Sequence, residues 1–288
     1  MRLSRLLGQV ETRAVRGDPE GAEIVAIGQD SGAVVPGTLF CCIPGTKVDG
    51  HDFAAQAVAA GAVAVVVQRF VDVDVPQVLV DDARAAMALL AAALHGHPSQ
   101  RIAVVGITGT NGKTTTTFFL RSVLEAAGRR AAVIGTLSGG VPRSEGRSGP
   151  GTTPAAPDLQ AHLAELAGEG FDSVAMEVSS HALVQHRVDG VSFAVAVFTN
   201  LSQDHLEFHG TMDDYFAAKA SLFEPERAAV AVVNADDPWG RRLLGAARLP
   251  TRPFCLAEAV DLVVDHRGSS FTWEGEPVRL RLAGTVNV

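Results

Sequence analysis

The sequence predicts an α/β fold: a small N-terminal α/β domain over residues 1–98, followed by a P-loop-type central domain over residues 99–288 with a mainly parallel sheet. Three observations predict it. Short apolar runs alternate with helical patterns along most of the chain. The polar stretch at 95–100, His-Gly-His-Pro-Ser-Gln, interrupts that pattern and predicts a linker. A glycine-containing loop at 109–115 stands between an apolar run and an amphipathic pattern.

In the first domain, short apolar runs predict strands, and the patterns between and after them predict helices. The expected strands are 24–27, 38–43, 63–67 and 77–80, and the expected helices are 53–60 and 83–94.

The central domain alternates strand and helix patterns until about residue 250 and then becomes shorter in rhythm and richer in strands. The expected strands are 102–107, 131–134, 173–178, 193–198 and 229–233, and the expected helices are 114–127, 157–169, 212–222 and 238–244. These strands are apolar almost throughout, which is typical of a parallel sheet covered by helices on both faces.

Composition argues against several classes of partner. The net charge is −8, with no long basic run, which disfavours nucleic acid or an anionic membrane as the main partner. No apolar run reaches the ~18 residues of a membrane span, and the N-terminus lacks the pattern of a signal peptide. Cys41, Cys42 and Cys255 have no metal-ligand spacing and predict buried, reduced thiols. We therefore expect a cytoplasmic protein that acts as a monomer.

The central loop ends in Gly112-Lys113-Thr114, yet the usual spacing of a phosphate-binding loop would place glycine at position 107, where the sequence has Ile. A shorter spacing that begins at Gly109 keeps the chemistry. Free N–H groups and the dipole of the following helix favour an anion. Lys113 would neutralise the β- and γ-phosphates, and the Thr114 hydroxyl would hold Mg²⁺. The alternative is an ordinary glycine turn with a capping threonine.

Three later side chains stand where an open α/β sheet would bring them to a phosphate site, beyond strand ends or on the next helix. Glu177 is a carboxylate that suits Mg²⁺, and His205 could be a second ligand. Lys219 has apolar helical neighbours, so its desolvated amine would have a lowered pKa and could react with carbon dioxide to form a carbamate, an anionic metal ligand. The alternatives are an exposed loop glutamate, a polar loop histidine and a snorkelling lysine. Only three of the 24 basic residues are lysines, at 47, 113 and 219, which favours roles that arginine cannot fill.

Six motifs together resemble the Mur ligase family, and within it the MurE-like tripeptide synthetases. They are 109–115 (GTNGKTT), 152–154 (TTP), 176–183 (MEVSSHAL), 185–187 (QHR), 198–205 (FTNLSQDH) and Lys219. The resemblance runs from about residue 24 to the end of the chain, and the short-spaced GTNGKT loop is that family's own form of the P-loop. The loop alone would fit any Mur ligase or folylpolyglutamate synthase, whereas the combination of Thr152-Thr153, 177–181 (EVSSH) and 185–187 (QHR) is specific to MurE-like members.

The resemblance implies an ATP-dependent amide ligase of peptidoglycan precursor synthesis, with ATP, UDP-MurNAc-L-Ala-D-Glu and a diamino acid as substrates. We expect meso-diaminopimelate rather than L-lysine. The D-Glu carboxylate would accept the γ-phosphoryl group of ATP, and the amine would attack the acyl phosphate. Because a carboxylate is a poor acylating agent, phosphorylation supplies the leaving group, and the protein contributes positioning and charge neutralisation.

The resemblance also implies roles for individual residues. ATP would be held by Gly109, Thr110, Asn111, Gly112, Lys113, Thr114 and Thr115. Mg²⁺ would be held by Thr114, Glu177, His205 and the carbamate of Lys219, and the catalytic residues would be Lys113, Lys219 and His205. The uridine nucleotide and muramoyl-dipeptide would contact Ser31, Thr46, Lys47, Val48, Thr152, Thr153, Ser179, Gln185 and Arg187.

Two features qualify the resemblance. The family usually has Arg after Asp-Ser, where this chain has Gly32, which leaves the detail of the uridine contact open. The segment 282–288 resembles a family segment that leads into a further helix, so we expect an N-terminal fragment without the amino-acid-binding domain. It should bind nucleotides weakly and not complete the ligation alone. Another Mur ligase, a folylpolyglutamate synthase-like ligase and a non-catalytic nucleotide-binding module remain alternatives.

Overall fold

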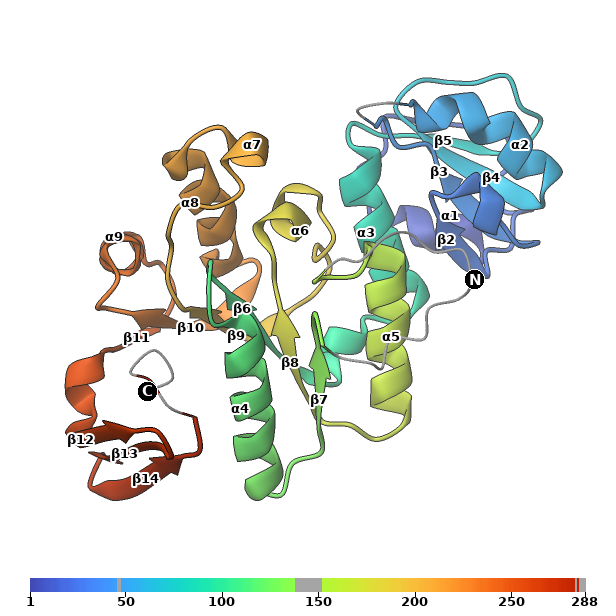
Figure 1. Cartoon of the computed structure of the whole chain (residues 1–288). Coiled ribbons are helices and arrows are strands. Elements are labelled where there is room, and N and C mark those ends of the chain that lie inside the picture. The colour runs from blue at the N-terminus through green and yellow to red at the C-terminus, as the bar shows by residue number, and fades with distance from the viewer. Residues whose placement is uncertain (46–47, 138–151, 283, 285–288) are drawn as a thin grey trace. The chain divides into compact units, whose positions relative to one another are not determined.

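A computed structural model describes residues 1–45, 48–137, 152–282 and 284 (Figure 1). The chain forms two compact units. Unit 1 comprises Met1–Ala103, Thr136–Asp172 and His181–Val191, and unit 2 comprises Val104–Gly135, Ser173–Ser180 and Ser192–Val288. Each unit gathers segments that are separate in the sequence. The sequence predicts a domain boundary between residues 98 and 99. Because the two units are not continuous segments of the chain, they do not test this boundary, and it stays a prediction.

A five-stranded sheet in the order β1-β5-β4-β3-β2 organises unit 1. Its strands are β1 (Ala14–Arg16), β2 (Ala26–Gly28), β3 (Thr38–Cys41), β4 (Ala62–Val67) and β5 (Gln77–Leu79). Only β1 pairs antiparallel with its neighbour; the other pairs of this sheet are parallel. Among the described residues up to 191, five helices besides the one that follows the phosphate loop are seen: α1 (Leu3–Leu7), α2 (Ala54–Ala59), α3 (Ala83–Leu94), α5 (Ala156–Gly168) and α6 (Ser180–Val184).

Both faces of this sheet are covered. Alternate residues of β3 enter different cores. Leu39 packs on the side of α1 and α3, together with Leu90, and Phe40 packs on the side of α2. Asp82 caps the N-terminus of helix α3: its carboxylate accepts hydrogen bonds from the N–H groups of Arg84 and Ala85.

A six-stranded sheet in the order β11-β10-β9-β6-β8-β7 organises unit 2. Its strands are β6 (Ala103–Thr108), β7 (Ala131–Ile134), β8 (Ser173–Glu177), β9 (Phe193–Phe198), β10 (Ala228–Asn234) and β11 (Thr251–Phe254), and its helices are α4 (Lys113–Ala126), α7 (Leu206–His209), α8 (Met212–Ala220) and α9 (Pro238–Ala246). The paired strands run parallel. Because β8 and β9 flank β6, the segments that follow all three strands meet at one edge of the sheet.

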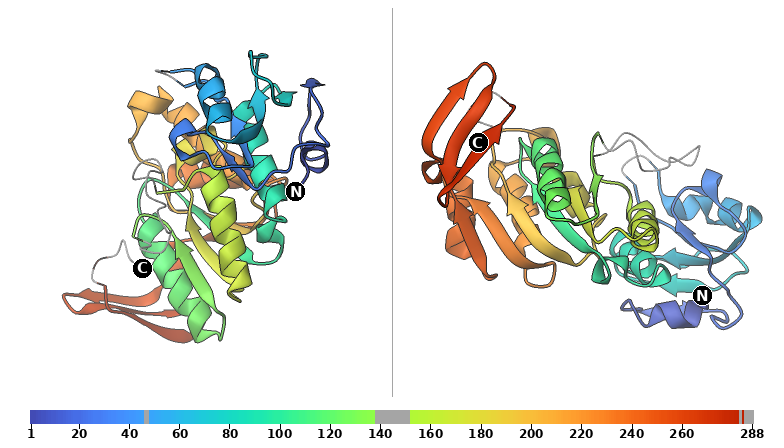
Figure 2. Two further views of the ribbon diagram at one scale, coloured as in Figure 1. Left: turned by 90° about the vertical axis from the view of Figure 1, so that its right-hand side faces the viewer. Right: turned by 90° about the horizontal axis from the view of Figure 1, so that it is seen from below.

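A separate antiparallel sheet ends the described chain (red in Figures 1 and 2). It consists of β12 (Val260–Asp265), β13 (Gly268–Trp273) and β14 (Glu276–Leu280). Short 3₁₀ segments lie at η1 (Ser31–Ala33), η2 (Gly50–Phe53), η3 (Pro98–Gln100), η4 (Ser221–Phe223) and η5 (Leu256–Glu258). Helix α4 lies along β7 and β8 (Figure 1), and its Val123 is 65% exposed.

The predicted fold class is confirmed, and every expected strand and helix has a counterpart within about two residues at its start. The elements α1, β1, α6 and α7 were not expected, because each is too short to show a period. Cys41 and Cys42 are buried, as predicted, but Cys255 is only partly buried because it follows the edge strand β11. In the described residues, none of the helices combines the length and apolarity needed to cross a membrane.

Candidate functional site

The candidate phosphate site lies where β6 passes through residues 109–112 into α4. Both glycines of the short spacing have positive φ, 147° at Gly109 and 86° at Gly112. Gly112 is the residue that precedes the first helical residue, Lys113. A Cβ at position 109 would clash with the hydroxyl of Thr199. Gly109 therefore serves both backbone conformation and close approach, which only glycine permits.

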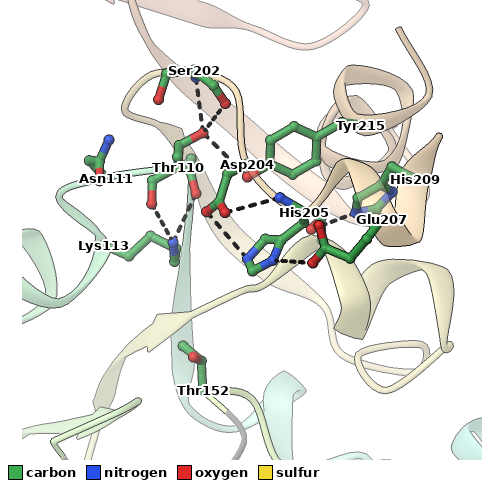
Figure 3. Close-up of polar contacts among 12 residues, drawn as sticks. Thr110, Asn111, Lys113, Thr152, Ser202, Asp204, His205, Glu207, His209 and Tyr215 are labelled. Carbon is green, nitrogen blue, oxygen red and sulfur yellow. Dashed lines mark hydrogen bonds and ion pairs between the residues drawn. The ribbon is translucent and has the colours of Figure 1, made fainter. Parts of the chain in front are cut away.

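Lys113 supplies the positive charge of this loop. Its Nζ donates to the carbonyl oxygens of Gly109 and Thr110, at 2.9 Å in each case (Figure 3). Burial lowers the pKa of Lys113, while Glu177 and Asp204 act in the opposite sense. The first N–H groups of α4 lack acceptors within the helix, and the dipole adds partial positive charge there. The arrangement is suited to binding a polyanion.

Glu177 ends β8 beside this helix start. Its side chain is 1% exposed, so the alternative of an exposed loop glutamate is wrong. Its Oε1 accepts a hydrogen bond from the Thr114 hydroxyl at 3.0 Å. Gly135, just after β7, leaves room for the carboxylate, because a Cβ there would clash with it. A hydroxyl and a carboxylate held together at a phosphate loop are hard oxygen ligands, and they fit Mg²⁺.

Lys219 reaches the same loop from α8. It is 1% exposed, so the snorkelling alternative is wrong. Its Nζ donates to the Gly109 carbonyl at 2.9 Å and lies 4.6 Å from the centre of the Tyr215 ring. Burial, reinforced by the charge of Lys113 and opposed by that of Asp204, lowers the pKa of Lys219 to about 7. Near neutral pH a substantial fraction of this amine is therefore unprotonated and nucleophilic.

His205 stands at the outer side of this group, at the start of α7, with φ 53°. Its side chain is 42% exposed, and its ring nitrogens lie 3.4 Å from Asp204 and 3.6 Å from Glu207. The ring meets Tyr215 edge-on at 6.2 Å (Figure 3). Tyr215 also contacts Lys219, so it borders both residues. Within the described ranges, no three His, Cys, Asp or Glu side chains converge to hold a metal ion. The predicted ligand set also includes the Thr114 hydroxyl and a carbamate on Lys219, and it stays a prediction.

Several residues implied as substrate contacts come together in unit 1. Arg187 donates from Nε and Nη2 to the Gln185 amide oxygen at 3.1 and 2.6 Å, and from Nη1 to the Thr153 carbonyl at 2.9 Å. Burial lowers the pKa of Arg187, and Arg84 adds to the effect. The Thr152 hydroxyl accepts a hydrogen bond from that of Thr136 at 3.3 Å. Arg187 is thus held in a fixed orientation by partners that a bound anion could share or replace.

The remaining implied contacts are placed separately. Ser31 opens η1, where the Asp30 side chain accepts from the Gly32 N–H at 2.9 Å. A cavity of about 40 Å³ adjoins this turn; Gly28, Asp30 and Asp158 are among the residues that line it. Val48 is 62% exposed. Ser179 lies between β8 and α6. Thr46 and Lys47 lie outside the described residues.

Three residues of the site were not assigned a role from the sequence. Asn200 hydrogen-bonds the backbone of the phosphate loop, Tyr215 contacts Lys219 and Thr110, and Asp204 influences both lysines. Tyr215 is four residues before Lys219, so helical spacing signals their contact. Asn200 gives no such signal, because its role depends on the neighbouring positions of β9 and β6 in the sheet.

Two family models match the chain. Residues 107–288 match the family model described as Mur ligase middle domain, and residues 23–95 match that described as Mur ligase family, catalytic domain. The UDP-N-acetylmuramoyl-L-alanyl-D-glutamate–2,6-diaminopimelate ligase of Syntrophomonas wolfei is 44% identical over 281 residues, covering 94% of this chain and 57% of the relative. The protein of that name from Streptomyces coelicolor is 47% identical over 288 residues, with 94% and 56% covered.

The structure of a ligase of the same name has 27% identity and a TM-score of 0.83, and the match covers 100% of this chain and 61% of that one. The chain thus spans little more than half the length of these relatives. One family model alone matches well over half of the chain, and the match begins two residues before the phosphate loop. The chain belongs to the Mur ligase family.

Proposed function

We propose that this chain holds ATP and UDP-MurNAc-L-Ala-D-Glu for an ATP-dependent amide ligation that adds a diamino acid, meso-diaminopimelate, to the D-Glu carboxylate. The observation that carries the proposal is the convergence on the phosphate loop of two lysines and a buried carboxylate from three different elements. Lys113 and Lys219 share the Gly109 carbonyl, and Glu177 accepts from Thr114.

In this reaction the γ-phosphoryl group passes from ATP to a carboxylate oxygen, giving ADP and an acyl phosphate. The incoming amine attacks the acyl carbon, inorganic phosphate leaves, and the amine gives up a proton. Lys113 exchanges its contacts with the loop carbonyls for phosphate oxygens and neutralises their charge. The N–H groups at the start of α4 orient the phosphates.

Thr114 and Glu177 would hold one Mg²⁺, and His205 with Lys219 would serve a second beside Glu177; the metal would withdraw charge from the phosphoryl oxygens. The unprotonated amine of Lys219 favours reaction with carbon dioxide, in which the N–C bond of a carbamate forms and one proton leaves. The carbamate would then offer oxygen ligands where an ammonium would repel a cation.

A held guanidinium such as that of Arg187 fits a carboxylate or pyrophosphate. The pattern of Thr152-Thr153 with Gln185-x-Arg187, which resembles MurE-like members, supports a muramoyl-dipeptide over a folate substrate. The cavity beside Ser31 is the proposed uridine site. A non-catalytic nucleotide-binding module would not need a buried, unprotonated lysine at the phosphate loop. We expect the protein to be cytoplasmic and monomeric, as a ligase of soluble nucleotide precursors would be.

Calorimetric titration tests the proposal. The chain should bind Mg·ADP and UDP-MurNAc-L-Ala-D-Glu, and Lys113→Ala should remove the first without changing the second. Phosphate release from ATP and the dipeptide substrate by a chain extended past Val288, with meso-diaminopimelate compared with L-lysine, tests the third substrate. Binding of dihydrofolate in preference to the muramoyl nucleotide would contradict the assignment. ¹³C NMR in labelled bicarbonate should show a carbamate signal that Lys219→Met lacks.

A further inference from the structure

Residues 199–202, which follow β9, form hydrogen bonds with the phosphate loop. We call this segment the clasp. The backbone carbonyl of Asn200 accepts from the Thr110 N–H at 2.9 Å, and its side-chain Oδ1 accepts from the Asn111 N–H at 3.0 Å. In return the Asn200 Nδ2 donates to the Asn111 carbonyl at 3.1 Å. The Thr199 hydroxyl donates to the same carbonyl at 2.7 Å. The Ser202 N–H donates to the Thr110 hydroxyl at 3.0 Å.

Asn200 therefore pairs with both backbone polar groups of Asn111, as a neighbouring strand would. A primary amide offers an acceptor and a donor on two atoms bonded to the same carbon, the carbonyl oxygen and the NH₂ group. Aspartate would keep the acceptor but lose the donor, and glutamine would be one methylene too long. The amide is also neutral, so it adds no negative charge near the phosphates.

The clasp limits which N–H groups can reach a ligand. Those of Thr110 and Asn111 already donate to Asn200 and point toward the clasp. The N–H of Thr116 donates to the Gly112 carbonyl, as in a regular helix. The donors available to an anion are therefore those at the start of α4, between these two ends.

Gly109 gives independent support. A Cβ at this position would clash with the Thr199 hydroxyl and would lie 3.0 Å and 3.1 Å from the backbone oxygen and nitrogen of Asn200. Because Gly109 has no side chain, residues 199 and 200 of the clasp can approach the loop backbone closely.

We propose that Asn200 is a positioning residue of the nucleotide site: it fixes the backbone at 110–111 so that Lys113 and the N–H groups at the start of α4 are arranged for phosphate before the nucleotide arrives. The proposal rests on the proposed function in that the ligand is a nucleotide phosphate. Preorganisation of this kind raises affinity by removing the ordering cost from the binding step. The clasp also connects the loop to Asp204 and His205, which follow it directly in the chain.

Amide hydrogen exchange followed by NMR tests the clasp without a ligand. In Asn200→Ala the Asn111 N–H loses its acceptor and should exchange ~3–10-fold faster, whereas the Thr110 N–H, bonded to the backbone carbonyl of residue 200, should change much less. Asn200→Asp keeps the acceptor and should leave Asn111 closer to the unmodified protein. Gln203→Ala, which removes an exposed amide from the same loop, is the matched control. Equal exchange of Asn111 in Asn200→Ala and the unmodified protein would overturn the clasp.

Binding of a fluorescent ADP analogue with Mg²⁺ tests the positioning role. Asn200→Ala should weaken it ~3–10-fold, with the melting temperature close to that of Gln203→Ala and with unchanged affinity for UDP-MurNAc-L-Ala-D-Glu. Unchanged nucleotide affinity, or an equal loss in Gln203→Ala, would overturn the role. If the unmodified chain failed to bind the analogue, the proposed function and the positioning role would both fail, while the exchange comparison would still decide whether the clasp exists.

Discussion

Replacing Lys219 by methionine should stabilise the protein at neutral pH, although it removes a residue of the candidate site. Methionine has a similar length and no charge. Burial lowers the pKa of Lys219 from 10.5 to about 7, and at ~1.4 kcal/mol per pH unit this corresponds to about 5 kcal/mol. Loss of the bond to Gly109 offsets ~1–1.5 kcal/mol, and loss of the contact with the Tyr215 ring offsets ~1 kcal/mol. We expect a net gain of roughly 2–3 kcal/mol in the free energy of unfolding at pH 7.

The pH dependence identifies the cause. The unfolded lysine keeps its proton up to about pH 10.5, whereas the folded one loses it near pH 7. Unfolding therefore takes up a proton between these values, and the contribution of Lys219 to stability rises with pH across that window. The advantage of Lys219→Met should be full at or below pH 7 and should fade toward pH 10.

Urea unfolding followed by tryptophan fluorescence in bicarbonate-free buffer measures this effect, because both tryptophans, Trp239 and Trp273, belong to unit 2. Lys219→Gln, which is likewise uncharged, is the matched control and should show the same trend with pH. A Lys219→Met protein less stable than the unmodified one at pH 7, or a difference that does not change with pH, would refute the reasoning.

Three further predictions follow from contacts in the two units. Glu177→Gln keeps an acceptor for Thr114 but removes the charge, so the Mg²⁺ concentration needed for half-maximal ADP binding should rise ~10-fold or more in a fluorescence titration; an unchanged Mg²⁺ dependence would argue against a metal at Glu177. Gly135→Ala places a Cβ against the Glu177 carboxylate and should lower the free energy of unfolding by ~1–3 kcal/mol. Gly245→Ala, in helix α9 with open space around it, is the control and should leave the free energy of unfolding unchanged or raise it by up to ~1 kcal/mol. Equal urea midpoints for the two variants would contradict this prediction. Arg187→Lys cannot reproduce the forked bonds to Gln185 and Thr153, so calorimetry should show ~10-fold weaker binding of UDP-MurNAc-L-Ala-D-Glu with unchanged Mg·ADP binding; a parallel loss of both would indicate misfolding instead.

Local patterns were sufficient for most of the secondary structure and for the phosphate loop. Glycine spacing, Lys113 and Thr114 are adjacent in sequence, and the strand before and helix after them are long enough to show their periods. Burial of Lys219 followed from its apolar helical neighbours, Phe216 and Phe223. The sequence does not disclose the order of strands in the sheet, and the role of Asn200 depends on that order.

His205 illustrates the other limit. Its place after a strand predicts the correct edge of the sheet, but its orientation is set by Asp204, Glu207 and the Tyr215 ring, which come from a turn, a short helix and the next helix. No single periodicity describes such a combination. Pairing of Arg187 with Gln185 is likewise a property of the turn after α6, which is too short to be recognised from its sequence.

The position of β6 inside the sheet has a consequence for biosynthesis. The partners of the phosphate loop are synthesised long after it: Thr114 and Glu177 are 63 residues apart, Asn111 and Asn200 are 89, and Gly109 and Lys219 are 110. When the loop emerges from the ribosome, none of these partner residues has yet been synthesised. Because contacts over such separations close slowly, the anion site should be among the last parts of unit 2 to mature during translation.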